Sequence, residues 1–208
     1  MVTSTAAVIL ASGSSIRLGS PKQLVDLDGT PLLERVVDDA LTWPVEAVVV
    51  VLGASAEAIL ETVDFGDAIV AINEAWEDGL ASSLRVGLDL LTRESHWEGV
   101  FVALGDQPGI PHAVPQGLLA AAAETQRPAV VPFYRYERGN PVLFARSLWP
   151  RLMTLTGDAG VTALLSTHPE WVEEVRFGDL PPRDVGTADD IEDLTLETRR
   201  GTGRASNH

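Results

Sequence analysis

Cysteine is absent from this 208-residue sequence, and lysine occurs once, as Lys22. The lack of cysteine excludes disulfide bonds, thiolate metal sites and a cysteine nucleophile. Basic residues are also scarce: 15 of them stand against 30 acidic residues, and the formal net charge is -15. A protein that binds nucleic acid independently of sequence needs a basic surface, so we expect no nucleic-acid partner. Any bound anion must instead meet local positive groups or a metal ion.

Long apolar runs are absent too, since none approaches the roughly 18 residues that a membrane-spanning helix needs. The N-terminus has no positively charged segment ahead of its short apolar stretch, unlike a secretory signal. The hydrophobic content of 45% and the charged content of 22% are those of an ordinary globular protein. We therefore expect a soluble, cytoplasmic protein without a membrane partner. Residues 1–194 are predicted to form one domain, and residues 195–208 a disordered tail.

Strand-length apolar runs alternate with helical patterns in the first two thirds of the chain. The apolar runs cover residues 6–10, 47–52, 68–72, 99–104 and 129–133. Helical patterns lie between them at 31–41, 54–62, 80–91 and 114–125. Thr30 is predicted to be the N-cap of the first, with Pro31 opening the helix. Because strands that are apolar throughout indicate burial on both faces, the predicted fold class is α/β: a three-layer, Rossmann-like, mostly parallel sheet with helices on both faces.

The pattern loosens after residue 133. Residues 141–144 are predicted to form a short edge strand, and residues 172–176 a late strand. Helical segments are predicted at 148–155 and 161–165. We expect this part of the chain to lie over one end of the sheet and to shape a substrate pocket.

A loop of small residues follows the first predicted strand, at the edge of the sheet where open α/β proteins bind ligands. Residues 10–22 read Leu-Ala-Ser-Gly-Ser-Ser-Ile-Arg-Leu-Gly-Ser-Pro-Lys. Small residues let backbone N–H groups approach an anion, and Arg17 and Lys22 add two positive charges, which suits a triphosphate. The spacing matches neither the P-loop nor the G-x-G-x-x-G dinucleotide motif. The alternative is a flexible turn with two solvated bases.

Asp106 follows the apolar run 99–104 and comes shortly before Pro108, which places its carboxylate at the same edge of the sheet. A carboxylate there can bind Mg²⁺, with phosphate oxygens and water as the other ligands. The alternative is a turn aspartate that accepts hydrogen bonds from nearby backbone N–H groups. The four histidines are too scattered for a metal site, and the sequence has no G-x-S-x-G serine motif.

Five segments carry a longer pattern. They are Leu10-Ala11-Ser12-Gly13 with Ser15, Arg17, Gly19 and Lys22-Gln23-Leu24; Asn73 and Trp76 with Gly79-Leu80-Ala81-Ser82-Ser83-Leu84 and Gly87; Gly105-Asp106-Gln107-Pro108; Arg138-Gly139-Asn140-Pro141; and Gly157-Asp158 with Gly160. Together they resemble the MobA-like nucleotidyltransferase superfamily, and within it the molybdenum cofactor cytidylyltransferase group. The resemblance covers residues 6–194 and implies the nucleotide-diphospho-sugar transferase type of fold.

The resemblance also implies an activity and a set of site residues. The activity is Mg²⁺-dependent transfer of CMP from CTP to a phosphate-bearing acceptor, a molybdopterin-type cofactor, with release of pyrophosphate. The implied residues are catalytic Arg17, Lys22 and Asp106; nucleotide-binding Leu10, Ala11, Ser12, Gly13, Gly79 and Ser83, the last two against the base; acceptor-binding Asn140 and Asp158; and metal-binding Asp106 and Asp184.

One position departs from the family pattern. Where relatives usually carry Asp-x-Asp-Thr-x-x-Asp, residues 184–190 read Asp-Val-Gly-Thr-Ala-Asp-Asp, so Gly186 replaces a carboxylate. This departure favours a non-catalytic alternative, a cofactor-binding chaperone that serves a molybdenum hydroxylase. Within nucleotidyl transfer, the alternatives are another NTP and another phosphorylated acceptor, such as a sugar phosphate or phospholactate.

Overall fold

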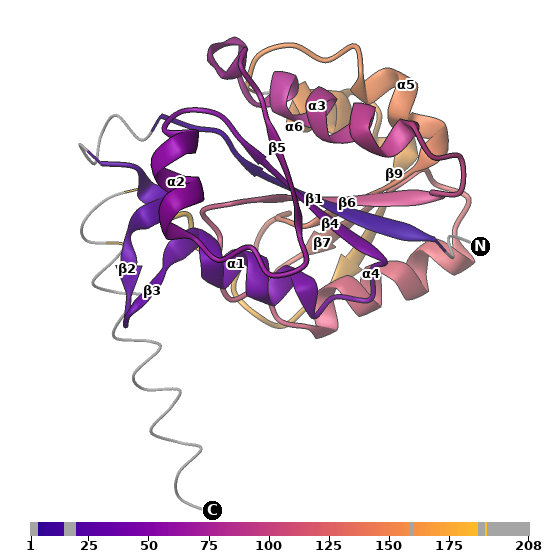
Figure 1. The fold of residues 1–208 in the computed structure, drawn as a ribbon. Coiled ribbons are helices and arrows are strands. Elements are labelled where there is room, and N and C mark those ends of the chain that lie inside the picture. Colours follow the sequence, from indigo (N-terminus) through magenta and orange to yellow (C-terminus); the bar gives the residue numbers. More distant parts are fainter. Residues whose placement is uncertain (1–3, 15–19, 159, 187–189, 191–208) are drawn as a thin grey trace, which may run out of the picture.

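A seven-stranded sheet forms the centre of the computed structural model, which describes residues 4–14, 20–158, 160–186 and 190 (Figure 1). In spatial order the strands are β5 (Ile69–Ile72), β4 (Ala47–Leu52), β1 (Thr5–Ala11), β6 (Gly99–Leu104), β8 (Val142–Ala145), β7 (Ala129–Phe133) and β9 (Val172–Arg176). β1 pairs in parallel with β4 and β6, and β4 pairs in parallel with β5. β8 runs antiparallel to both β6 and β7, whereas β7 and β9 are parallel.

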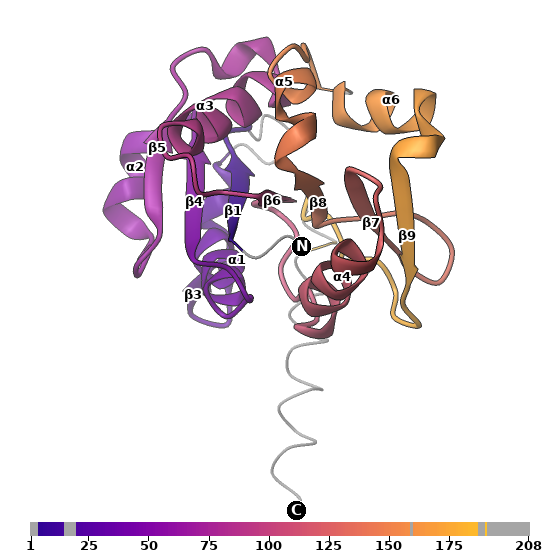
Figure 2. The same cartoon turned by 90° about the vertical axis from the view of Figure 1, so that its right-hand side faces the viewer.

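Helices cover both faces of this sheet (Figure 2). On one face lie α1 (Leu32–Leu41), α2 (Ala56–Thr62) and α4 (Ala113–Glu124); on the other lie α3 (Leu80–Thr92), α5 (Trp149–Leu152) and α6 (Gly160–Thr167). Alternate residues of β1 serve the two cores, with Ile9 packing toward α1 and Val8 toward α3. The sheet is thus buried on both faces, which explains the unbroken apolar runs. Within the described residues, no helix is long and apolar enough to cross a membrane.

The predicted fold class is confirmed: the protein has a three-layer α/β fold built on a mostly parallel sheet. The five apolar runs form β1, β4, β5, β6 and β7, with bounds that differ from the prediction by at most one residue. The predicted tail over residues 195–208 lies outside the described residues.

The prediction of an edge strand near residue 142 was wrong. β8 lies inside the sheet, between β6 and β7, and the edge strands are β5 and β9. Its side chains serve both cores, since Leu143 packs on one face and Phe144 on the other. A four-residue apolar run carries no signal for its position in the sheet, and Pro141 suggested an edge because proline cannot donate to a ladder. Pro141 in fact precedes the strand.

Thr30 is also not the N-cap that the sequence suggested. It pairs with Leu27 in a two-stranded hairpin of β2 (Asp26–Leu27) and β3 (Thr30–Pro31), and α1 begins only at Leu32. The turn between the strands is Asp28-Gly29, with φ angles of 54° and 88°. Asp-Gly is a preferred pair for such two-residue hairpins, because both positions need positive φ. The sequence therefore contained a hairpin signal, Asp28-Gly29, directly before the threonine that we predicted as the N-cap.

Candidate functional site

Two loops leave the carboxyl edge of the sheet side by side, because β1 and β6 are parallel neighbours. Leu10 lies opposite Leu104 in the register, and the backbone N–H of Gly105 donates to the carbonyl of Leu10 at 2.9 Å. A Cβ at Gly105 would lie 2.7 Å from the Cβ of Ala11, closer than side chains pack. Gly105 is thus required for the close approach of the two strand ends, and it brings Asp106 next to the small-residue loop.

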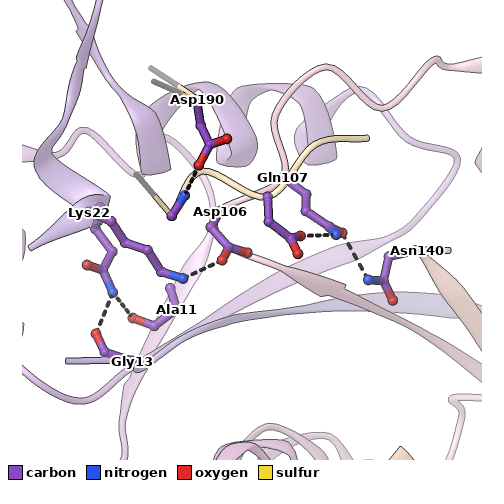
Figure 3. Close-up of polar contacts among 10 residues, drawn as sticks. Ala11, Gly13, Lys22, Asp106, Gln107, Asn140 and Asp190 are labelled. Atoms are coloured by element: carbon purple, nitrogen blue, oxygen red, sulfur yellow. Dashed lines mark hydrogen bonds and ion pairs between the residues drawn. The ribbon is translucent and has the colours of Figure 1, made fainter. Parts of the chain in front are cut away.

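Lys22 and Asp106 meet at this edge (Figure 3). The Lys22 Nζ forms an ion pair with Asp106 Oδ2, although the residues lie 84 positions apart. Lys22 begins a 3-10 turn at Lys22–Leu24, and Asp106 follows the end of β6. The Asp106 side chain is 13% exposed and that of Lys22 is 25% exposed, so the pair is partly accessible to solvent rather than enclosed in the core. The structure thus brings together two of the three predicted catalytic residues; the third, Arg17, lies outside the described residues.

Gln23 holds the small-residue loop from beneath. Its Nε2 donates to the carbonyl oxygens of Ala11 at 2.8 Å and of Gly13 at 3.1 Å, and the residue is 1% exposed. Carbonyl oxygens repel a phosphate, so hydrogen bonds that engage them favour an anion-binding loop. The sequence motif contained Gln23, but nothing in its spacing indicated this role.

Ser12 is tied to α3 by a buried hydroxyl network. Ser12 Oγ lies 2.6 Å from Ser83 Oγ, and Asn73 Nδ2 donates to Ser83 Oγ at 2.9 Å and to Ser82 Oγ at 2.7 Å. Ser83 is completely buried and Ser12 is 3% exposed. The expected contact between the Ser83 side chain and a base is therefore not available in this structure. The Ser83 hydroxyl is instead hydrogen-bonded to Ser12 in the loop.

Gly79 and Asp158 lie against each other at the N-terminus of α3. Gly79 has a φ of 91°, and Asp158 Oδ1 accepts a hydrogen bond from the backbone N–H of Leu80 at 3.0 Å. A Cβ on Gly79 would lie 2.7 Å from that oxygen. A carboxylate at a helix N-terminus is stabilised by the unpaired N–H groups and the helix dipole. The structure thus gives Asp158 a capping role and places a nucleotide candidate beside an acceptor candidate.

An apolar cavity of about 120 Å³ opens beside these residues, between α3, α6 and the ends of β1, β6 and β8. Most of its lining is aliphatic, and the polar groups on its wall are Asn140, Asp158 and Thr162. The remaining lining residues are Leu10, Leu80, Ala81, Leu84, Val102, Leu104, Val142 and Val161. The site therefore has an apolar compartment next to the charged Lys22–Asp106 pair, and Asn140 lies on the wall of this compartment.

The Gln107 side-chain amide joins Asn140 to the Asp184 carboxylate, and its contact with Asn140 is drawn in Figure 3. Gln107 Nε2 donates to Asp184 Oδ1 at 2.5 Å, and Asn140 Nδ2 donates to Gln107 Oε1 at 2.9 Å. Asp184 was predicted as a second metal ligand, and here its carboxylate accepts from Gln107. The segment that carries it is fastened to the site by the backbone N–H of Val185, which donates to the carbonyl of Asp106 at 3.0 Å. Gln107 was part of a recognised motif, but its role between these two residues was missed.

A carboxylate also reaches the position where the family pattern was broken. The Gly186 backbone N–H donates to Asp190 Oδ2 at 3.0 Å. Within the described part of the chain, no group of three or more acidic or histidine side chains could hold a metal by protein ligands alone. The role of Asp106 as a metal ligand stays a prediction, in which a substrate or water would supply the other ligands.

The loop after Asp106 is anchored to α1 by a second, separate contact. The Gly109 backbone N–H donates to Asp39 Oδ2 at 2.8 Å. Burial raises the pKa of the Asp39 carboxyl, and this hydrogen bond offsets the rise only in part. Burial likewise raises the pKa of Tyr134, whose hydroxyl donates to the Asn140 carbonyl at 2.6 Å. These contacts fix the backbone on which Gln107 and Asn140 stand.

Comparison with known proteins places this architecture. The model of the MobA-like NTP transferase domain matches residues 7–172. Nicotine blue oxidoreductase of Paenarthrobacter nicotinovorans is 30% identical over 184 residues, which are 83% of this chain and 86% of that protein. The crystal structure of the Mycobacterium tuberculosis Rv0371c homologue from Mycobacterium sp. strain JC1 has a TM-score of 0.84 and 32% identity, covering 96% of this chain and 99% of that one.

A third relative is Rv0371c of M. tuberculosis H37Rv, solved as a complex with manganese. It has a TM-score of 0.81 and 28% identity, covering 93% of this chain and 99% of that one. The family match spans the sheet from β1 to the start of β9 and contains the Lys22–Asp106 pair, Gln107 and Asn140. This chain belongs to the MobA-like NTP transferase domain family.

Proposed function

We propose that this protein transfers CMP from CTP to a phosphate-bearing acceptor of the molybdopterin type and releases pyrophosphate. The observation that carries the proposal is the Lys22–Asp106 pair beside the small-residue loop of residues 11–14. The pair puts a positive charge and a carboxylate that could bind a cation at the edge of the sheet where α/β proteins bind nucleotides. In a chain of net charge -15, a triphosphate needs such local compensation.

In the proposed reaction an oxygen of the acceptor phosphate attacks the α-phosphorus of CTP, and the bond to the β-phosphate oxygen breaks. The leaving group is pyrophosphate, and no covalent intermediate with the protein is needed. Lys22 neutralises charge that grows on the phosphates, assisted by Arg17. Backbone from Leu10 to Gly13 holds the nucleotide, so positioning and electrostatics supply most of the rate enhancement.

The residues present fit a Mg²⁺ ion held largely by the substrate. Asp106 already attracts an ammonium group, and a divalent cation needs the same negative, partly buried environment. Asp106 would hold the ion, and Asp184, whose Oδ1 accepts a hydrogen bond from Gln107, is the second carboxylate that would supply an oxygen. When bound, Mg²⁺ would neutralise phosphate charge as a Lewis acid. The manganese complex of the related Rv0371c supports a divalent cation in this family.

The choice of CTP rests on the resemblance of two segments to the cytidylyl group. These are the loop of residues 10–24 and the segment Gly79–Ser83, where the buried Ser83 hydroxyl acts through Ser12. A small pocket should reject a purine by size and by the polar groups a poor fit leaves unpaired. Equal kcat/KM values for CTP and GTP would contradict this choice.

The acceptor class is the least constrained part of the proposal. A sugar phosphate or phospholactate would use the same chemistry, and a protein that only binds the cofactor for a molybdenum hydroxylase would use the same site without turnover. The direct experiment mixes the protein with CTP, Mg²⁺ and molybdopterin and measures pyrophosphate release. Release with molybdopterin alone among these acceptors supports the proposal, and nucleotide binding without release supports the chaperone.

A second function is favoured by one comparison: the 30% identical relative is named an oxidoreductase. An oxidoreductase needs an electron carrier, and a nicotinamide dinucleotide is one that could bind at the edge of the sheet where α/β proteins bind nucleotides. A thermal-shift panel separates the two functions, because a ligand that binds the native state raises its melting temperature. Stabilisation by CTP with Mg²⁺ supports the transferase, and stabilisation by NADH or NADPH alone supports the oxidoreductase.

A further inference from the structure

The two hydrogen bonds that link Asp184 to Asn140 through Gln107 have a fixed direction. An ionised carboxylate only accepts hydrogen bonds, so the Gln107 group that faces Asp184 must be its NH₂. The carbonyl oxygen of Gln107 then faces Asn140, and Asn140 must donate a hydrogen bond to it from its own NH₂. The observed contacts, Gln107 Nε2 to Asp184 Oδ1 and Asn140 Nδ2 to Gln107 Oε1, follow this order. One charge thus fixes the orientation of two amides in series.

The consequence appears at the wall of the apolar cavity. One hydrogen of the Asn140 NH₂ is donated to Gln107, which places the NH₂ on that side and leaves the side-chain oxygen Oδ1 for a ligand, and no described residue donates to this oxygen. Figure 3 shows this oxygen turned away from Gln107. The backbone of Asn140 is held independently, by the Tyr134 hydroxyl at its carbonyl. The side chain therefore presents a hydrogen-bond acceptor to the cavity it lines.

A second polar group on the wall has the same character. Asp158 Oδ1 accepts from the Leu80 N–H, and its carboxylate has no hydrogen to donate. The rest of the lining is aliphatic except for Thr162. A ligand that fills this cavity must cover apolar surface and offer hydrogen-bond donors to Asn140 and Asp158. Its volume of about 120 Å³ suits a single small ring, since cavities of about 150 Å³ bind benzene.

We propose that Gln107 is a positioning residue that fixes Asn140 as a hydrogen-bond acceptor, so that the cavity selects a compact apolar ring carrying an N–H or O–H donor. The proposal deepens the proposed function, on which it rests for the view that one ring of the acceptor molecule enters this cavity. It assigns the specificity of the acceptor side to Asp184 and Gln107, neither of which lines the cavity.

Pyrrole and furan test the proposal without any nucleotide. The two rings have nearly the same shape, but pyrrole offers an N–H donor where furan offers an oxygen acceptor. Their dissociation constants are measured by ligand-observed NMR on the full chain. We expect pyrrole to bind about tenfold more tightly, because furan would set an oxygen against Asn140 Oδ1 and leave it unpaired. Equal affinities, tighter furan binding, or no binding of either ring overturns the proposal.

Variants then test the role of Gln107. In Gln107→Met the Asn140 amide is free to turn and can offer its NH₂ to furan, so furan binding no longer leaves Asn140 Oδ1 unpaired. The affinities for pyrrole and furan should then differ by no more than about twofold. Asp184→Asn removes the charge that sets the order and should also reduce the ratio; because Asp184 is exposed, this variant keeps the test open if Gln107→Met does not fold. Gln116→Met, at an exposed position on α4, is the matched control and should keep the wild-type ratio.

A spectroscopic readout separates positioning from a merely structural role. The side-chain NH₂ of Asn140 should exchange its protons slowly in the wild type, since it is hydrogen-bonded, and faster in Gln107→Met. A ratio that survives in a folded Gln107→Met protein overturns the proposal, whatever the exchange rate. Failure of the transferase assignment would appear elsewhere, as absence of stabilisation by CTP with Mg²⁺, so the two failures are distinguishable.

Discussion

The two halves of the site differ in what they are made of. On the side of β1 and β6, an ion pair and a loop of small residues gather charge and backbone groups around Lys22 and Asp106. On the side of β8 and α6, aliphatic side chains surround a cavity whose polar groups are held in fixed orientations by Gln107 and the α3 N-terminus. The first half is suited to neutralising phosphate charge and the second to recognising shape and hydrogen-bond pattern. Substitutions should therefore have separable effects on rate and on specificity.

The sharpest test of this difference is Asp106→Ala. We expect turnover to fall by about 10³-fold or more, because the phosphate charge loses its cation-binding group. Ring binding in the apolar cavity should not change. The measurements are pyrophosphate release and Mn²⁺ binding by electron paramagnetic resonance, with exposed Asp67→Ala as the control. Substantial turnover in Asp106→Ala would mean that the cation lies elsewhere, and the non-catalytic function would gain support.

Lys22→Ala should have the next largest effect, a loss of turnover of about 10²-fold, as expected for one preorganised charge at the reacting phosphate. The variant also removes the ammonium that now occupies Asp106, so Mg²⁺ affinity without nucleotide should rise. The wild type should bind Mg²⁺ and CTP with strong mutual dependence. Arg93→Ala, which removes a 74% exposed positive charge, serves as the control. A folded Lys22→Ala protein with normal turnover would remove Lys22 from the mechanism.

Gly186→Asp tests the position at which the carboxylate of the family pattern is missing. The nearest atom that its Cβ would meet is Asp190 Oδ2 at 3.8 Å, so the side chain has room. The new carboxylate at position 186 and that of Asp190 should together hold a cation more tightly. Turnover at limiting Mg²⁺ should therefore rise about two- to fivefold through tighter oxygen coordination. The same change at Gly178, which also has open space, is the control. Slower or metal-indifferent turnover would show that Gly186 does not mark a lost ligand.

Asp39→Asn should give the smallest effect, because Asp39 touches neither half directly. Its raised pKa means that ionisation is unfavourable in the fold, so the wild type gains stability as the pH falls from above that raised pKa toward the ordinary value of 3.8. Asparagine keeps an acceptor for the Gly109 N–H and carries no charge. The variant should be more stable at pH 7 by less than about 1 kcal/mol, and this advantage should vanish below pH 4.

Chemical denaturation across pH 4 to 8 checks this expectation. A variant less stable than the wild type at pH 7 would show that the charge of Asp39 strengthens the Gly109 contact more than its burial costs. Turnover should stay within about twofold of the wild type, as for a surface substitution remote from reacting groups. A larger loss would place the loop anchor within the charged half of the site.

The two halves also differ in how well they could be predicted from the sequence. Apolar runs such as residues 47–52 identify buried parallel strands, and Lys22 and Asp106 lie in the segments that follow two of these strands, so the sequence predicted that both lie at the same edge of the sheet. The hydrogen bonds that join Asp184, Gln107 and Asn140 link residues 77 and 33 positions apart, and the place of β8 depends on its pairing with β6 and β7, and no local pattern encodes either. The burial of Ser83 was missed for a similar reason. The helical spacing of residues 80–91 does not reveal that Ser12 and Asn73 hydrogen-bond to Ser83.

The place of β8 has a consequence for the order in which the chain can fold during synthesis. The strands β1, β4, β5 and β6 are complete by Leu104, but the partner that covers the free side of β6 ends only at Ala145. At 5–20 residues per second, the ribosome needs about 2–8 s to make those 41 further residues. During that interval the hydrogen-bonding edge of β6, an apolar strand, is open to other chains. A slow or weakened β8 should therefore reduce the yield of native protein before it affects the stability of molecules that have already folded.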